Sequence, residues 1–334
     1  MKQEASSPQR APLSNSLPQA GERTNEKGNL QSLRAVALRI AGEGHVVGEF
    51  QALGGPCEVL LDISAWEHPD REAAYHFVKL AAAEAWRIES KFSRYNTSGV
   101  VHQINNAKGQ PVVLDEESSA LLDFADSCHR LSDGAFDITS GVLRRAWNFD
   151  GSDRLPKPAA VAALLPLVGW HRVSWNRPKL RLPPGMEIDL GGIGKEYAVD
   201  QAARQLAAAG VQSALVNFGG DIFALGPRAN GEPWVVGIDD PNATGQACVR
   251  AVPLRRNGLA TSGDARRFLK KNGKRYGHIL NPKTGWPVQG APRSVSVKAD
   301  SCIDAGMLAT FAMLKGPDAE AFLEAEDVEH FIIW

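Results

Sequence analysis

The chain contains 334 residues, of which 43% are hydrophobic, so it can bury the core of one large domain or of two closely packed ones. Its formal net charge is −1, which argues against the broad basic face of proteins that bind nucleic-acid phosphates. We therefore expect no nucleic-acid partner.

The cysteines give no sign of a metal cluster. They lie far apart in the sequence and form no C-x-x-C pair, so neither a zinc site nor a disulfide framework is indicated. We expect buried free thiols. The four cysteines are Cys57, Cys128, Cys248 and Cys302.

Residues 1–45 are expected to form a disordered arm before a single domain of residues 46–334. Residues 1–30 are rich in Ser, Pro, Gln and Asn and contain almost no large apolar groups, so they cannot bury enough surface to fold. The arm shows neither an ordinary signal peptide nor a lipoprotein cysteine, and no later apolar run reaches membrane-spanning length. These features predict a cytoplasmic protein without a membrane span, and an export signal at a different start site stays open.

The first part of the domain is predicted to contain two strands followed by two helices. Apolar residues on both sides of Leu53 and Gly54 predict a strand, a turn and a second strand that ends near Asp62. After Asp70, apolar residues recur every three or four positions, which is typical of an amphipathic helix. Asp115 is suited to cap a second helix. The apolar stripe of this second helix is expected to contain Leu121, Phe124, Cys128 and Leu131.

Two polar features lie beside these helices. Arg94 and Tyr95 fall in a turn-rich stretch that we expect at the surface, where the tyrosine ring could stack on a flat ligand or cover the edge of the core. Asp137 lies between apolar residues in GAFDIT and would be costly to bury without partners. It is expected to accept hydrogen bonds from a ligand or from backbone amides.

The second part of the domain is rich in strands. A short helix is predicted over residues 157–167, a hairpin in HRVSWN and KLRL, and a strand over residues 186–190. Strands are also predicted in VQSALVNFGGDIFALG, PWVVGIDD, ACVRAVPL, GLATSGDARRFLKKN, KRYGHILNPKTGWPV and SVSVKA, and a helix that ends at Gly316 follows. Helices separated by runs of strands favour an α+β fold with mixed, mainly antiparallel sheets flanked by helices.

The stretch EIDLGGIGKEYAVD, residues 187–200, is the strongest local indication of a ligand site. Its glycines let backbone amides approach a ligand, and a helix is predicted over residues 195–209. The amino end of that helix, together with the charge of Lys195, would stabilise an anion such as a pyrophosphate. The spacing matches neither the Walker pattern nor the dinucleotide fingerprint, so a structural turn remains the alternative.

Other candidate groups are weaker when taken alone. His278 could act as a general base near neutral pH or serve as a structural hydrogen-bonding group. Ser262 and Asp264 could bind a ligand or form a turn. No Ser, His and Asp trio stands at a recognisable spacing.

Taken in order, these stretches resemble the flavin transferase family, the ApbE-type FAD:protein FMN transferases. The resemblance extends from about Phe50 to Gly316. It depends on FQALGGPCEV, FSRYN, GAFDIT, DLGGIGKEYAVD, NFGGD, ATSGDARRF, HILNPKTG and LAT followed by an apolar helix.

The resemblance implies a function and a set of site residues. The chain would bind FAD as substrate and, with Mg²⁺, move its FMN half to a Thr or Ser hydroxyl of an acceptor protein, a redox or membrane-associated flavoprotein, and release AMP. His278 matches the histidine linked to transfer. The flavin-nucleotide positions are matched by Leu53, Tyr95, Ala135, Phe136, Asp137, Asp189 and Lys195. The metal-site positions are matched by Gly192, through its backbone carbonyl, Ala309 and Thr310.

One departure from the family pattern concerns the metal site. The family usually carries an aspartate four residues before the matching threonine, where this chain has Gly306. Asp304 could replace it only if the backbone there is not helical, and we expect Asp304 to cap a helix instead. Smaller departures are Asn281 in place of an aspartate and Leu53 in place of a methionine. These changes keep two alternatives open, an FAD-binding protein with weak or lost transfer and a pyrophosphatase that splits FAD into FMN and AMP.

Overall fold

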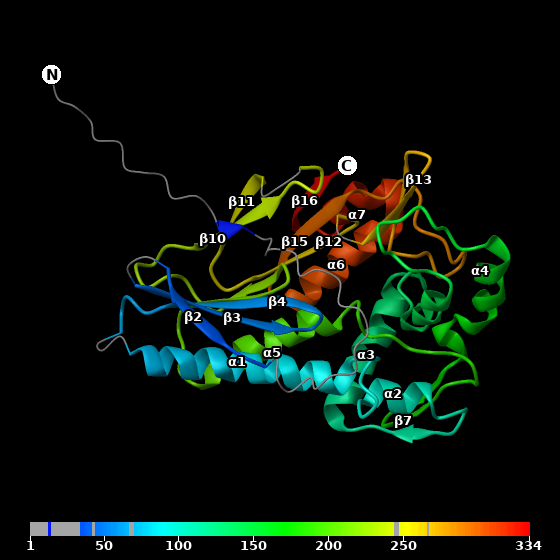
Figure 1. The fold of residues 1–334 in the computed structure, drawn as a ribbon, viewed down its shortest axis with the longest axis horizontal. Helices are drawn as coiled ribbons and strands as arrows, with labels where there is room; N and C mark the ends of the chain where they lie inside the picture. The colour runs from blue at the N-terminus through cyan, green and yellow to red at the C-terminus, as the bar shows by residue number, and fades with distance from the viewer. Residues whose placement is uncertain (1–12, 15–33, 42–43, 67–69, 244–246, 266) are drawn as a thin grey trace.

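A computed structural model of the chain describes residues 13–14, 34–41, 44–66, 70–243, 247–265 and 267–334. Its centre is an eight-stranded sheet in which every neighbouring pair is antiparallel (Figure 1). The strands, in spatial order, are β16 (Glu329–Ile333), β15 (Ser294–Ala299), β12 (Gly258–Gly263), β9 (Asp221–Ala224), β8 (Ala214–Phe218), β4 (Gly55–Asp62), β3 (His45–Ala52) and β2 (Ala37–Ile40). The predicted α+β class is confirmed.

The hairpin of β3 and β4 forms as the sequence predicts. The strands pair from His45 with Asp62 to Ala52 with Gly55, and Leu53 and Gly54 form the turn with φ values of 55° and 78°. Two consecutive residues with positive φ match the twist of an antiparallel hairpin, which explains why a glycine stands in this turn.

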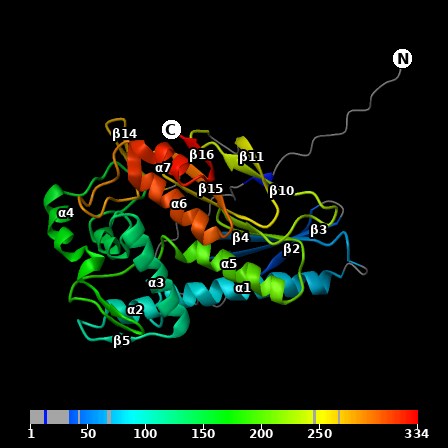
Figure 2. The same cartoon turned by 180° about the vertical axis from the view of Figure 1, so that it is seen from behind.

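One face of the large sheet is covered by α1 (Arg71–Phe92), α5 (Gly194–Ala208) and α6 (Cys302–Lys315) (Figures 1 and 2). The carboxylate of Asp70 caps α1 by accepting a hydrogen bond from the amide of Glu72, as predicted for this helix start. α1 approaches β3 so closely that a Cβ atom on Gly48 would lie 2.1 Å from Val78 Cγ1. A glycine is therefore needed where this helix crosses the sheet.

The opposite face of the sheet is covered by a second, smaller sheet. This sheet contains β1 (Leu13–Ser14), β10 (Trp234–Asp239) and β11 (Cys248–Leu254). Neighbouring residues of one strand alternate between the two cores: Val46 belongs to the core under the helices and Val47 to the core under β10 and β11. The period of two along the strands thus separates the layers.

The remaining elements form a lobe beside the ends of α1 and α5, on the right in Figure 1. Its helical elements are α2 (Val100–Asn105), α3 (Glu116–Leu131), η2 (Ile138–Arg145), α4 (Pro158–Leu164), η3 (Leu165–Leu167) and η4 (Trp170–Arg172). Its strands are β5 (Val112–Val113), β6 (Ser174–Asn176) and β7 (Lys179–Arg181), with the hairpin of β13 (Phe268–Lys271) and β14 (Lys274–Gly277) close by. Two further elements, η5 (Gly316–Asp318) and α7 (Ala319–Ala325), lead from α6 to β16.

Several predictions about these elements are confirmed and two are wrong in detail. Asp115 caps α3, but Leu131 is 69% exposed and does not belong to the apolar stripe. α2 was not predicted, because its six residues are too few to show the apolar periodicity of a helix. Cys57, Cys128 and Cys302 are buried free thiols as expected, whereas Cys248 is exposed.

The strand predicted over residues 186–190 does not form. Met186, Ile188 and Leu190 are buried, so the alternating pattern correctly marks which side chains face the core. However, the amide and carbonyl of Ile188 bond to the side chain of Asn105 rather than to a neighbouring strand. An extended segment without a strand partner keeps the alternating side chains of a strand but lacks the backbone hydrogen bonds to a neighbouring strand.

The boundary predicted for the arm at residue 45 is too late. β2 pairs with β3 and is part of the large sheet, and Arg34 donates a hydrogen bond to Ser90 on α1 over 2.8 Å. The rest of the predicted arm, residues 1–12 and 15–33, lies outside the described residues. Within the described part of the chain, no helix has the length and apolarity needed to cross a bilayer.

The contact of α1 with β3 gives a testable prediction for stability. Gly48→Ala would place a methyl group against Val78 and lower the free energy of unfolding by about 2 to 3 kcal/mol. Chemical denaturation measures this change. The matched control is Gly55→Ala in β4, where an added Cβ meets no atom within 4 Å and the change should stay within about 0.5 kcal/mol. Equal effects of both variants would contradict the proposed steric cause.

Candidate active site

The glycine-rich junction before α5 forms a tight turn that is fixed by Asp189. The carboxylate of Asp189 pairs with the guanidinium of Arg94 and accepts a hydrogen bond from the amide of Gly191 over 3.0 Å. A Cβ on Gly141 would lie 2.5 Å from Asp189 Cβ, so that glycine allows the η2 segment to contact the junction. The helix after the turn begins at Gly194, one residue before the predicted start.

Arg94 brings Tyr95 to the same place. Its guanidinium donates to the Tyr95 hydroxyl over 2.6 Å and lies 4.7 Å from the centroid of the tyrosine ring. Tyr95 is 79% exposed, so its outer face is open to a planar ligand and does not cover the core. The Nε atom of Arg94 is buried and has no hydrogen-bond partner within the described residues.

Lys195, the second residue of α5, forms an ion pair with Asp221 of β9. Burial lowers the pKa of Lys195, but the charges of Asp221 and Glu196 outweigh this effect and raise it above its usual value. The ammonium group is therefore a permanent positive charge at the amino end of α5. Its side chain also passes within 4.0 Å of the Cβ position of Gly219, in the glycine turn between β8 and β9.

The next residue, Glu196, points toward α6 rather than β9. It is 8% exposed, and a Cβ atom on Gly306 would lie 2.6 Å from its Cγ atom and 3.1 Å from its Cδ and Oε1 atoms. Burial, followed by the charge of Asp221, raises the pKa of Glu196 to about 8, although the charge of Lys195 opposes the rise. Its Oε2 atom is buried without a hydrogen-bond partner. Sequence reasoning did not single out this residue, because nothing in KEYAVD distinguishes it from a solvated helix face.

His278 follows β14 and is partly buried. Burial, followed by the charge of Arg267, lowers its pKa to about 4. Its ring is therefore neutral at physiological pH, and its Nδ1 atom is buried without a hydrogen-bond partner. The charge of Lys195 acts on the ring in the same direction, which places His278 in the electrostatic field of the α5 terminus.

Arg267 is a further cationic group of this site that the sequence prediction did not include. Burial, followed by the charge of Arg94, lowers the pKa of its guanidinium, so the two guanidinium groups lie close enough to repel each other. The charges of Arg267 and Lys195 thus act on the neutral histidine, and the charge of Arg94 acts on Arg267. The sequence carries a signal for this in the cationic pair of GDARRF, next to the predicted ligand turn.

In the predicted segment from Ala135 to Asp137, the Phe136 ring contacts the glycine turn and the aspartate is paired within the protein. Asp137 is 7% exposed, and its oxygens accept hydrogen bonds from the amide and hydroxyl of Thr139 and from the amide of Trp170. Backbone amides therefore satisfy this buried carboxylate, which is one of the two expected outcomes. Phe136 approaches Gly192 to 3.2 Å from its Cβ position, so it lies against the glycine turn.

The predicted metal positions on α6, Ala309 and Thr310, are consecutive residues of the helix and so point in different directions. Thr310 stands one turn after Gly306 and shares a hydrogen bond of 3.0 Å with the hydroxyl of Ser262, whereas Ala309 is fully buried. Asp304 lies within the first helical turn, where its carboxylate bonds to the capping Ser301. It thus supports the cap instead of being the cap residue itself, and it is not turned toward the position of Gly306.

The contacts join most of the predicted residues but not all of them. Arg94 links Tyr95 to Asp189, and the field of Lys195 and Arg267 links the α5 terminus to His278. Leu53 lies at the tip of the hairpin of β3 and β4, where its amide bonds to Glu89. Among the hydrogen bonds, ion pairs and ring contacts of the described residues, none joins Leu53 to this group.

The residues of this site fit a divalent cation and a pyrophosphate. Three of the eight buried side-chain atoms without a hydrogen-bond partner in the described residues belong to Arg94, Glu196 and His278. Buried polar atoms are normally paired, so three such atoms in one site indicate that a ligand completes it. Among the described residues no group of three or more His, Cys, Asp or Glu side chains could hold a metal by itself. A cation here would rely on backbone, hydroxyl and phosphate oxygens, as Mg²⁺ commonly does.

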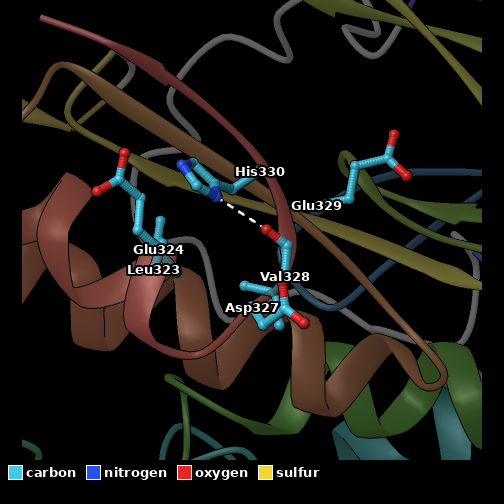
Figure 3. A pocket seen from close by; sticks show the side chains of 6 residues that line it. All are labelled: Leu323, Glu324, Asp327, Val328, Glu329 and His330. Carbon is cyan, nitrogen blue, oxygen red and sulfur yellow. Dashed lines mark hydrogen bonds between the residues drawn. The ribbon is translucent and has the colours of Figure 1, made fainter.

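A separate cavity of about 420 Å³ lies between α7 and β16 (Figure 3). Three of its six lining residues are acidic, and His330 bonds through Nδ1 to the carbonyl of Val328. None of the predicted site residues lines it. An acidic lining repels phosphates, so this cavity is not part of the candidate site.

Comparison with known proteins identifies the family of the chain. The model of the ApbE family matches residues 56–332. The chain belongs to the ApbE family. A curated member named FAD:protein FMN transferase, from Haemophilus influenzae, is 32% identical over 260 residues, which cover 75% of this chain and 73% of that protein.

Solved structures of ApbE-family proteins have the same fold. The apbe protein of Thermotoga maritima superposes with a TM-score of 0.75 at 29% identity and covers 89% of this chain and 94% of its own. The flavin transferase ApbE of Vibrio cholerae also gives a TM-score of 0.75, at 25% identity, and covers 86% and 93%. The α+β architecture and the family resemblance seen in the sequence are thus confirmed.

The lowered pKa of His278 gives a prediction for stability against pH. The unfolded chain gains a proton on this histidine near pH 6.5, whereas the folded protein resists protonation until about pH 4, so stability falls as the pH drops through this interval. Replacing His278 with Gln should remove on the order of 2 kcal/mol of this pH dependence. Urea unfolding at pH 7, 6, 5 and 4.5 measures it, with the exposed His76→Gln as the control. Parallel curves for wild type and His278→Gln would show that the ring titrates normally.

Proposed function

We propose that this protein is an FAD:protein FMN transferase that moves FMN from FAD to a Thr or Ser hydroxyl of an acceptor protein and releases AMP. The observation that carries the proposal is the cationic site of this ApbE-family chain, in which the charges of Arg267 and of Lys195, at the amino end of α5, act on the neutral His278, while Arg94 pairs with Asp189 and acts on Arg267. A pyrophosphate carries the charge that such a site stabilises. The exposed ring of Tyr95 offers a face on which a flavin or adenine ring can stack.

In the proposed reaction, the acceptor hydroxyl oxygen forms a bond to the phosphorus on the FMN side of the pyrophosphate. The bond from that phosphorus to the bridging oxygen breaks, and AMP leaves with the bridging oxygen. The hydroxyl proton passes to the imidazole of His278, which is unprotonated at neutral pH and so is able to accept it. Lys195 and Arg94 hold the phosphate oxygens in line, which is the main requirement of phosphoryl transfer.

Mg²⁺ fits the family resemblance and the donor set of the site. The Gly192 carbonyl and the Thr310 hydroxyl would hold it, and Ala309 could offer only its carbonyl oxygen. A bound Mg²⁺ supplies charge neutralisation at the phosphate oxygens. The glycine at position 192 is exposed, so its carbonyl is accessible to a cation beside the turn.

The identity of the acceptor follows only from the chemistry. It must present a Thr or Ser hydroxyl to the open side of the site, and a redox or membrane-associated flavoprotein is the kind of partner that we propose. The cytoplasmic location stays a prediction from the sequence.

The transfer reaction is tested directly with purified protein. Incubation with FAD, Mg²⁺ and a model acceptor that carries a Thr should increase the intact mass of the acceptor by one FMN phosphodiester. AMP release at the same rate without any acceptor would identify a pyrophosphatase instead. FAD retention without any AMP release would identify a flavin-binding protein that has lost transfer.

The role of His278 is tested by replacing it with Ala. Transfer should fall by about 10²- to 10⁴-fold, the usual contribution of a general base, while the Kd for FAD changes by less than about threefold. Single-turnover transfer and equilibrium FAD binding measure the two effects. A loss of FAD binding equal to the loss of transfer would make His278 a binding residue. The control is His76→Ala, far outside the site on α1, which should leave both values unchanged.

A further inference from the structure

The first observation concerns the space beside Gly306. A side chain at this position would begin 2.6 Å from Glu196 Cγ and 3.1 Å from its carboxyl carbon, which is shorter than any ordinary contact. The region that an aspartate at position 306 would fill is therefore already occupied by a carboxyl group. This group reaches it from α5, whereas the aspartate of the family pattern would reach it from α6.

The second observation concerns the partners of the neighbouring carboxylates. Asp221 pairs with Lys195, Asp200 accepts two backbone amides at the start of α6, and Asp304 bonds to the capping serine of its own helix. Glu196 differs from these three because its Oε2 atom is buried and has no hydrogen-bond partner. A buried carboxylate oxygen in this state needs a positive ligand or a donor.

The third observation is the direction in which Glu196 points. It lies against Gly306 on α6, and Thr310 is one turn further along the same face of that helix. Glu196 also lies four residues after Gly192 along the chain, at the first turn of the helix that the glycine junction opens. Glu196 thus belongs to the helix that follows the Gly192 junction and contacts the helix that carries Thr310.

We infer that Glu196 supplies the carboxylate ligand of the divalent cation in this protein. Gly306 has no side chain and therefore leaves the room that Glu196 needs to reach the site. Compared with the family pattern, the carboxylate comes from α5 instead of α6 and keeps its position beside Thr310. The inference depends on the proposed transferase function, since that function calls for the cation. It concerns the carboxylate ligand of the cation, which Gly306 cannot provide because it has no side chain.

The inference changes the expected behaviour of an aspartate at position 306. The carboxyl carbon of an aspartate lies roughly 1.5 Å beyond its Cβ atom, so it would overlap the Glu196 carboxyl group, which is 3.1 Å from the same Cβ position. Gly306→Asp alone therefore places two carboxylates in one buried space. We expect its Tm to fall by about 5 °C, whereas the double variant Glu196→Ala/Gly306→Asp recovers most of this loss.

The deciding measurement is calorimetric titration of Mg²⁺ into the full chain, with FAD present and without an acceptor. Glu196→Gln and Glu196→Ala should each weaken Mg²⁺ binding by about tenfold or more, because a charged ligand is lost. Glu196→Ala/Gly306→Asp should bind Mg²⁺ within about threefold of the wild type, since it returns the carboxylate from the other helix. The control is Glu84→Gln, a buried carboxylate on α1 that bonds to Arg87 and should leave Mg²⁺ affinity unchanged.

The outcomes separate this inference from the proposed function. Wild-type Mg²⁺ affinity in Glu196→Gln and Glu196→Ala would overturn the inference, and so would a double variant that binds as weakly as Glu196→Ala. FAD affinity and FMN transfer by the wild type are measured in parallel. Their absence would refute the proposed function instead, whereas intact transfer with unchanged Mg²⁺ binding in the Glu196 variants would refute only the role of Glu196.

Discussion

The ion pair between Lys195 and Asp221 is the interaction on which the site depends. Asp221 is 2% exposed in the middle of the large sheet, and a carboxylate buried there is tolerated only with a charged partner. The pair fixes the first turn of α5 against β9. Because consecutive residues on a helix point about 100° apart, fixing Lys195 toward the sheet turns Glu196 toward α6. One ion pair thus orients both the cation at the proposed phosphate position and the carboxyl group at the proposed metal position.

Close contact between backbone segments is the second constraint. Gly141 allows the η2 segment to contact Asp189, and Gly306 allows α6 to contact Glu196. In both places a single added carbon would displace a charged side chain. The glycines are therefore part of the site although they carry no chemical group, and their cost in backbone entropy is offset by the contacts that they permit.

The charges of the site are arranged for an anionic ligand. Arg94 and Arg267 repel each other, and burial, followed by the charges of Arg267 and Lys195, keeps His278 neutral. A bound phosphate group would relieve the repulsion between the two arginines. The same arrangement gives His278 its place in the proposed reaction, since only an unprotonated imidazole accepts a proton. ApbE-family membership and this electrostatic arrangement thus point to the same chemistry.

The sequence by itself determined the elements whose signals are local: the turn at Leu53 and Gly54, the capped helices after Asp70 and Asp115, and the family motifs that brought Lys195 and His278 to attention. Periodicity, capping and turn chemistry act within a few residues, so they can be read along the chain. The alternating pattern of residues 186–190 also showed correctly which side chains face the core. Whether these residues pair as a strand depended on Asn105, which bonds to Ile188 from 83 residues away.

Only the tertiary structure decided which groups share the site. The contact of Glu196 with Gly306 joins residues 110 positions apart, from the difference of their numbers, and the coupling of Arg267 to Arg94 and His278 joins three separate segments. Neither follows from any pattern along the chain, because the partner that satisfies or displaces a buried charge is set by how helices and strands pack. The sequence showed that a carboxylate is missing at position 306, and the packing of α5 on α6 showed where another one lies.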